Sequence, residues 1–136
     1  MKFKKLLEGM NIIDSKGDMN KEISRIAYDS RKVRTDTLFV CIDGTVVDGH
    51  EYIHEAIGNG AVALLTQKAT DIPEGISVAK VSNTRYGLAH ASDKFYSHPS
   101  GKFKVVGVTG TKGKTTTTYM MKSILEHKNK KVGLIG

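Results

Sequence analysis

A glycine-rich segment, residues 107–116, limits the folds open to this chain more than any other part of its sequence. It reads GVTGTKGKTT and lies between an apolar run and a stretch with helical periodicity. Glycines between a strand and a helix permit a turn whose backbone N–H groups surround phosphate oxygens. A following lysine then reaches the β- and γ-phosphates, and a threonine hydroxyl ligates Mg²⁺. The segment therefore indicates a strand, a phosphate-binding loop and a helix in succession.

The match is to a shortened form of this motif. The strict pattern has a glycine five residues before Gly113, where this chain has Val108, so the useful glycine is Gly110. The threonines at 115–118 are poor helix formers at a helix start, so local helix stability does not explain them. Hydroxyls that face phosphate and metal would explain them. The alternative is an ordinary glycine-rich turn with an incidental lysine, and spacing and context favour nucleotide binding.

Short strands and helices alternate along the chain, which predicts an α/β architecture. We expect strands at 23–28, 38–42, 61–66, 76–81, 103–108 and from 131, and helices at 3–7, 50–57, from a cap at Ser82 or Asn83 to about 98, and at 115–127. The segment 98–101 resembles a linker. Residues 1–100 are thus expected to form one domain, and residues 101–136 the incomplete start of a second α/β domain, because one βαβ unit cannot build a covered sheet.

Composition narrows the functional classes. The net charge of +7 permits a polyanionic partner, but the basic residues are scattered, so nucleic-acid binding is not favoured. No apolar run approaches the ~18 residues that span a bilayer, so no membrane insertion is expected. The single cysteine, Cys41, lies in an apolar run, which favours a reduced, buried thiol and an intracellular protein.

Residues 50–54, HEYIH, match the HExxH pattern of zinc proteases. Glycines at 58 and 60 end the helix one turn later, and no third ligand stands nearby in the sequence. The plainer interpretation is an amphipathic helix with Ile53, Ala56 and Ile57 in the core and the histidines near its exposed or ligand-facing start. We expect zinc to be irrelevant to this chain.

A third group of polar residues is Asp29, Ser30 and Arg31, near the end of a predicted strand and followed by the glycine-bounded loop 43–50. Serine and arginine at such a place could hydrogen-bond a sugar hydroxyl and a diphosphate. Spacing alone favours turn chemistry with a surface ion pair, in which Arg31 pairs with Asp29 or Asp48. Both interpretations stay open on the residues alone.

Taken together, these pieces resemble the Mur ligases, particularly those of the MurE type. Residues 29–31 (DSR), 38–40 (LFV), 48–53 (DGHEYI), Ala56 and 60–61 (GA) look like the family's N-terminal uridine-binding domain. Residues 95–100, 107–116 and 131–136 are similar to its passage into the ATP-binding central domain. Lys112 departs from the asparagine that the family most often has there. MurF-type ligases share the DSR and DGH elements but resemble the phosphate loop less well.

The resemblance implies a cytoplasmic enzyme of peptidoglycan-precursor synthesis that uses ATP and Mg²⁺. ATP would phosphorylate the D-glutamyl carboxylate of UDP-MurNAc-L-Ala-D-Glu, and the amine of a diamino acid, diaminopimelate or lysine, would attack the acyl phosphate. Family members are much longer, so we expect this chain alone to be an inactive fragment. The oligomeric state and the choice of diamino acid stay open.

The resemblance also assigns roles to residues. The uridine diphosphate would contact Tyr28, Ser30, Arg31, Thr45, Val46 and Val47. The nucleotide triphosphate would contact Gly110, Thr111, Lys112, Gly113, Lys114, Thr115 and Thr116. Within that set Lys114 would be the catalytic residue and Thr115 the Mg²⁺ ligand. Two other functions remain as alternatives: a uridine-nucleotide binding module without catalysis, and a P-loop NTPase of another class with an unrelated N-terminal domain.

Overall fold

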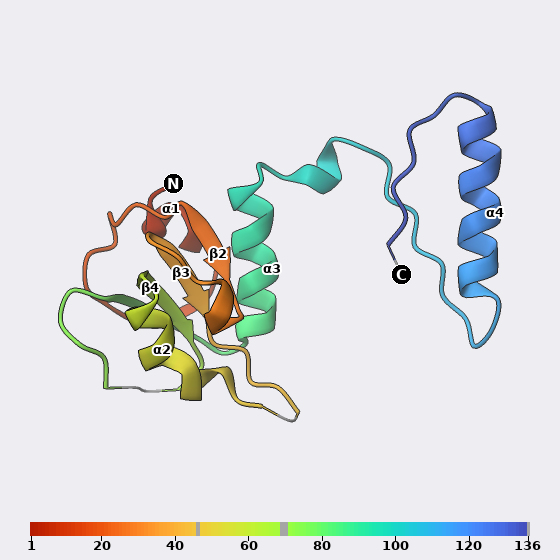
Figure 1. Ribbon diagram of the computed structural model, residues 1–136. Helices are drawn as coiled ribbons and strands as arrows, with labels where there is room; N and C mark the ends of the chain where they lie inside the picture. The colour runs from red at the N-terminus through yellow and green to blue at the C-terminus, as the bar shows by residue number, and fades with distance from the viewer. Residues whose placement is uncertain (46, 69–70, 136) are drawn as a thin grey trace. The chain divides into compact units, whose positions relative to one another are not determined.

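The computed structural model describes residues 1–45, 47–68 and 71–135 (Figure 1). The chain divides into two compact units, Met1–Pro99 and Ser100–Gly136. The first contains a sheet with helices on both faces, and the second is built around one helix. No helix in the described ranges is both long and apolar enough to cross a membrane.

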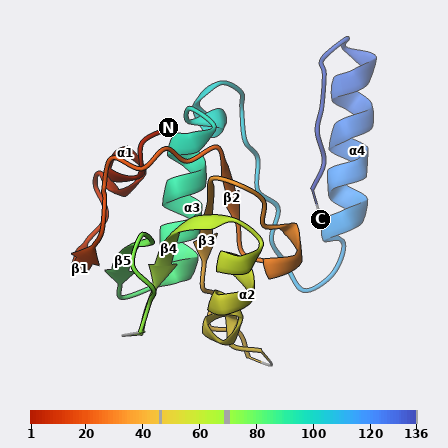
Figure 2. The ribbon, with the colours of Figure 1, turned by 60° about the vertical axis from the view of Figure 1, so that its left-hand side comes forward.

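Within the described residues, the first unit has one five-stranded sheet in the order β1-β5-β4-β3-β2, which Figure 2 shows from left to right. The strands are β1 (Ile12–Lys16), β2 (Arg25–Ala27), β3 (Thr37–Val40), β4 (Ala61–Thr66) and β5 (Ser77–Val81). The pairs β2–β3, β3–β4 and β4–β5 are parallel, whereas β1 runs antiparallel to β5 at one edge. Parallel strands need crossover connections and covered faces, and the helices of this unit provide the cover.

Helices cover the two faces of the sheet through separate apolar clusters. α1 (Phe3–Leu7) and α3 (Thr84–Phe95) pack on one face, and α2 (Ile53–Gly58) packs on the other. Alternation along β4 serves both clusters, because Leu65 belongs to the α1–α3 cluster and Leu64 to the α2 cluster. Gly87 brings α3 close to β4, since a Cβ there would lie 2.6 Å from Cδ2 of Leu65.

Two short 3₁₀ helices lie at the carboxyl ends of parallel strands. η1 (Ser30–Lys32) follows β2, and η2 (Gly49–Tyr52) follows β3 and leads into α2. Because β2 and β3 are parallel, their carboxyl ends lie at the same end of the sheet, and both connections leave the sheet there. The structure thus brings residues 28–31 next to the loop between β3 and η2.

The second unit contains α4 (Lys114–His127), which the glycine-rich segment precedes, and η3 (Pro99–Gly101) spans the boundary between the units. All described residues of α4 are at least partly exposed, as are the flanking segments. Figure 1 shows these flanking segments as extended chain without strand arrows.

The structure confirms most of the expected elements and corrects others. The helix at 3–7 and the strand at 61–66 have the predicted bounds, and Asn83 caps α3 through its side chain, which accepts a hydrogen bond from Tyr86 N. The predicted strands at 103–108 and 131–135 are wrong, because neither segment forms ladder hydrogen bonds with a partner strand among the described residues. Strand β1 was missed because four of its five residues are exposed, so it has no apolar run.

The single cysteine lies where the sequence places it, in the interior. Cys41 is fully buried within the α2 cluster, and its backbone N–H donates to the Leu65 carbonyl at 2.9 Å. Burial raises the pKa of the Cys41 thiol to about 12, so the thiol stays protonated and unreactive at neutral pH.

Leu65 offers a test of this packing. Leu65→Ala removes a fully buried side chain between α3 and the sheet and is expected to lower the free energy of unfolding by about 2–5 kcal/mol. Ile13→Ala, on the edge strand and 57% exposed, is the control and should change it by no more than about 0.5 kcal/mol. Equal effects of the two substitutions in urea denaturation would contradict the described core.

Candidate functional site

A cavity of about 520 Å³, a size that suits a small organic ligand, lies at the carboxyl ends of β2 and β3. Its walls combine aromatic, charged and glycine residues. They are Tyr28, Asp29, Ser30, Arg31, Phe39, Ile42, Gly44, Val47, Gly49, Tyr52 and Glu55. The cavity thus brings together residues from three separate parts of the sequence.

An Asp29–Arg31 pair shapes one wall. The Asp29 carboxylate accepts the Arg31 backbone N–H at 3.1 Å, and it pairs with Nε and Nη2 of the same arginine at 2.9 Å each. These hydrogen bonds hold the pKa of Asp29 below its ordinary value. The Arg31 side chain is 83% exposed, so the pair contributes little to stability but holds the guanidinium in place. The sequence left Asp29 and Asp48 as possible ion-pair partners of Arg31, and in the structure Arg31 pairs with Asp29.

Ser30 lies between this pair and α2. Its side chain is largely buried, and its carbonyl oxygen accepts hydrogen bonds from Val33 N at 3.2 Å and from Nδ2 of Asn59 at 3.1 Å. The Ser30 hydroxyl takes part in none of the hydrogen bonds among the described residues. Because Ser30 lines the cavity, this hydroxyl is available to a ligand there.

The loop after β3 forms the opposite wall. Gly44 N donates to the Val47 carbonyl at 3.1 Å, and Gly49 N donates to the Ile42 carbonyl at 2.8 Å, which closes the loop at its base. A Cβ at position 49 would lie 2.7 Å from the backbone nitrogen of Ile42, so only glycine fits this close approach. Of the predicted loop residues, Val47 lines the cavity, Thr45 does not, and Val46 lies outside the described residues.

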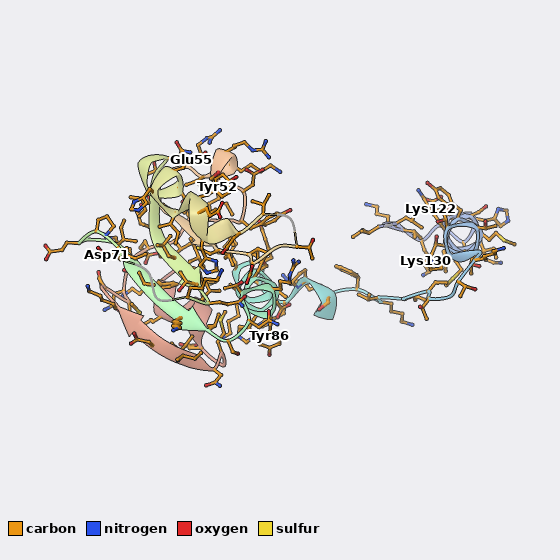
Figure 3. All side chains as sticks on the ribbon, turned by 90° about the horizontal axis from the view of Figure 1, so that it is seen from below. Tyr52, Glu55, Asp71, Tyr86, Lys122 and Lys130 are labelled. Carbon is orange, nitrogen blue, oxygen red and sulfur yellow. The ribbon has the colours of Figure 1, made fainter. Side chains whose placement is uncertain are left out.

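Tyr52 and Glu55 were not among the predicted site residues, although both line the cavity. They come from η2 and α2, and Figure 3 shows both at the same end of the first unit. Tyr52 is 38% exposed, so its ring is accessible to a planar ligand. Their spacing of three residues at a helix start was the signal available in the sequence, because such residues lie on one helix face.

The HExxH match does not assemble a metal site in the part of the chain that the structure describes. The ring nitrogens of His50 are both engaged, Nδ1 with Asp48 Oδ1 at 2.5 Å and Nε2 with the Gln67 backbone N–H at 3.1 Å. No group of three or more ligating side chains occurs among the described residues, and His54 is exposed. The His50 ring therefore has no free lone pair for zinc.

Asp48 connects His50 to the end of β4. Its carboxylate accepts the His50 backbone N–H at 3.0 Å and a hydrogen bond from Nζ of Lys68. The Lys68 hydrogen bond, followed by the contacts with His50, holds the pKa of Asp48 well below its ordinary value. Asp48 is thus a carboxylate anion at neutral pH.

In the second unit, the glycine-rich segment ends in the geometry of an anion-binding turn. Gly110 and Gly113 have φ angles of +152° and +78°, which favour glycine, and α4 begins directly after Gly113. The helix has no side-chain cap. The backbone N–H groups of Lys114, Thr115 and Thr116 have no hydrogen-bond partner among the described residues, as the first turn of a helix leaves them. These amides can therefore bind anionic oxygens at the positive end of the helix dipole.

The Lys114 side chain folds back over this turn, and its Nζ donates to the Gly110 carbonyl at 2.6 Å. The ammonium group is thus placed on the loop that the glycines form, rather than extended into solvent. Thr111, Lys112, Thr115 and Thr116 are exposed. The residues present therefore fit a nucleotide phosphate group, and the Thr115 hydroxyl has no hydrogen-bond partner in the part of the chain that the structure describes.

Family models match both units. The model of the Mur ligase family, catalytic domain, matches residues 22–100, and that of the Mur ligase middle domain matches residues 108–136. Relatives named UDP-N-acetylmuramoyl-L-alanyl-D-glutamate–2,6-diaminopimelate ligase are 48% identical in Clostridioides difficile and 46% identical in Alkaliphilus metalliredigens. Both alignments cover 100% of this chain and 28% of the relative, so the chain spans little more than a quarter of the length of these proteins.

Solved structures of MurF ligases are also similar to this chain. One crystal structure of MurF from Acinetobacter baumannii has a TM-score of 0.62 at 30% identity, covering 77% of this chain and 22% of that one. MurF ligase from Thermotoga maritima, in complex with ADP, has a TM-score of 0.60 at 34% identity, covering 76% of this chain and 23% of that one. Because the first family model alone covers more than half of the residues and includes the cavity walls, this chain belongs to the Mur ligase family.

Proposed function

We propose that this chain supplies the uridine-nucleotide pocket and the ATP phosphate loop of a cytoplasmic ligase that adds diaminopimelate to UDP-MurNAc-L-Ala-D-Glu. The observation that carries the proposal is the cavity at the carboxyl ends of β2 and β3, because it unites the DSR turn with the glycine-bounded loop. Residues 1–100 would be the uridine-binding domain and residues 101–136 the first part of the ATP-binding domain.

The cavity has the chemistry that a uridine nucleotide requires. Tyr28 and Tyr52 offer accessible aromatic rings for a base, and the Ser30 hydroxyl offers a donor and acceptor for a carbonyl or imide group. Arg31 keeps Nη1 free of Asp29, so it can still donate to a diphosphate oxygen. Val47 lines the cavity and belongs to the loop that would touch the diphosphate part of the ligand.

The phosphate loop has the groups that ATP requires. Gly110 and Gly113 shape the turn, the amides of residues 114–116 bind phosphate oxygens, and Lys114 neutralises their charge. The Thr115 hydroxyl would hold Mg²⁺. ATP, when bound, supplies the phosphoryl group that activates the D-glutamyl carboxylate for attack by an amine. The role of this loop is to position that group and to neutralise its charge.

Diaminopimelate is favoured over other acceptors because the relatives named for it are 41–48% identical across this whole chain. The MurF structures are 30–34% identical, so the MurF-type alternative has weaker support. A binding module without catalysis is disfavoured by the phosphate loop, which such a module would not need.

Ser30 tests the pocket. Ser30→Ala removes a hydroxyl that has no hydrogen-bond partner among the described residues, so the melting temperature should stay unchanged while UDP binding weakens by about 1 kcal/mol, measured by calorimetry. Ser15→Ala, on the exposed edge strand β1, is the matched control and should bind UDP like the unmodified chain. Equal affinities of the Ser30 and Ser15 variants would contradict the assignment of this pocket.

Arg31 separates a ligand contact from a structural ion pair. Because the Asp29–Arg31 pair is exposed, Arg31→Ala should leave the melting temperature within experimental error and weaken UDP binding several-fold. Arg25→Ala removes another exposed arginine, from β2 outside the cavity, and serves as the control. A lower melting temperature with normal UDP affinity would assign Arg31 to the ion pair alone.

Lys114 tests the second site independently. Lys114→Ala should weaken ATP binding by about tenfold or more, because it removes a charge-assisted contact to phosphate. UDP affinity should not change, since every wall of the cavity lies in the first unit. Lys130→Ala, beyond the end of α4, is the control for net charge. Parallel losses of ATP affinity in both variants would indicate nonspecific attraction instead of a phosphate site.

A further inference from the structure

The His50 side chain is 6% exposed and held in one protonation pattern by its two neighbours. A backbone N–H can only donate, so Nε2 accepts from Gln67 N at 3.1 Å and carries no proton. The proton of the neutral ring is therefore on Nδ1, which donates to Asp48 Oδ1 at 2.5 Å. The two contacts together select one tautomer.

The contacts of His50 tie the loop after β3 to β4. Asp48 lies near the end of the loop 43–49, and its second oxygen accepts from Lys68, which follows β4. Nζ of Lys68 also lies 3.9 Å from Oδ2 of Asp43, at the beginning of the same loop. Both ends of the loop thus reach the carboxyl end of β4 through side chains.

The chain of contacts continues to α3. Oε1 of Gln67 accepts from the backbone N–H of Thr84 at 2.9 Å and from its hydroxyl at 2.6 Å, and Thr84 is fully buried. Nη2 of Arg85, the next residue of α3, donates to the Asp43 carbonyl at 3.3 Å. The loop is therefore anchored to the sheet and to the start of a long helix.

We propose that His50, as its Nδ1-protonated tautomer between Asp48 and the Gln67 amide, is a positioning residue that fixes the described residues of the loop 43–49 and thereby shapes the cavity. The loop contributes Gly44, Val47 and Gly49 to the cavity wall, whereas the His50 ring itself does not line it. The consequence for ligand affinity rests on the proposed function, but the anchoring of the loop does not.

This role accounts for the first histidine of the HExxH match. A zinc ligand needs a lone pair that His50 uses to accept from Gln67. A histidine that only fills space would need neither a fixed tautomer nor two polar partners. The second histidine, His54, is exposed and provides a matched control within the same motif.

The first experiment is ¹⁵N NMR of the histidine rings in the 136-residue chain near neutral pH. His50 should show a protonated Nδ1 and an unprotonated Nε2. A protonated Nε2 would overturn the proposal without any substitution.

The second experiment measures amide hydrogen exchange and UDP affinity in His50→Ala, His50→Gln and His54→Ala. In His50→Ala the Gly44 and Gly49 amides should exchange about tenfold faster or more, because the loop opens locally, while the Cys41 amide stays protected. UDP affinity should fall several-fold. His50→Gln keeps an acceptor for the Gln67 amide, so its exchange rates and UDP affinity should lie between those of His50→Ala and the unmodified chain. His54→Ala should have the exchange rates and the UDP affinity of the unmodified chain.

Unchanged exchange at Gly44 and Gly49 in folded His50→Ala would overturn the anchoring role. Faster exchange with unchanged UDP affinity would overturn the link between the loop and the cavity. If the unmodified chain binds no UDP, the proposed function fails, while the tautomer and the exchange rates still decide the role of His50. If His50→Ala does not fold, His50→Gln and the tautomer decide it.

Discussion

Parallel pairing of β2, β3 and β4 is the constraint on which the candidate pocket depends. The carboxyl ends of parallel strands lie at the same end of the sheet, so the connections that follow β2 and β3 must leave the sheet side by side. This places the Asp29–Arg31 turn opposite the glycine-bounded loop, although the two are separated in the sequence by a whole strand. An antiparallel arrangement of the same strands would send the two connections to opposite edges and leave no cavity between them.

Around the carboxyl ends of these strands, polar side chains form hydrogen bonds that fix the backbone of the connecting segments. Asp29 caps η1 and holds Arg31, Asp48 caps η2 and holds His50 and Lys68, and Gln67 joins β4 to α3. A loop that is anchored in this way loses less conformational entropy when a ligand binds, so more of the contact energy appears as affinity. In contrast, the Ser30 hydroxyl has no hydrogen-bond partner among the described residues, although Ser30 lines the cavity.

In the second unit, the candidate site is built from residues that are close together in the sequence. Its glycine turn leaves the first amides of α4 without a partner among the described residues, a backbone geometry that suits an anion, and Lys114 folds back over the turn. The exposed side chains of α4 and its flanking segments include apolar residues such as Tyr119, Met120 and Ile124.

The sequence by itself determined the features that depend on local chemistry. The apolar run of β4, the cap of α3 at Asn83 and the glycine turn before α4 were all predictable from neighbouring residues. The residues of the DSR turn were also predictable, and the structure places Tyr28, Ser30 and Arg31 at one cavity. Only the tertiary structure decided which ion pair Arg31 forms, that Tyr52 and Glu55 join the cavity, that β1 pairs with β5, and that His50 is bound on both ring nitrogens. These depend on contacts between residues far apart in the chain, and hydrophobic periodicity and motif spacing carry no information on which distant backbone amide or carboxylate a side chain will meet.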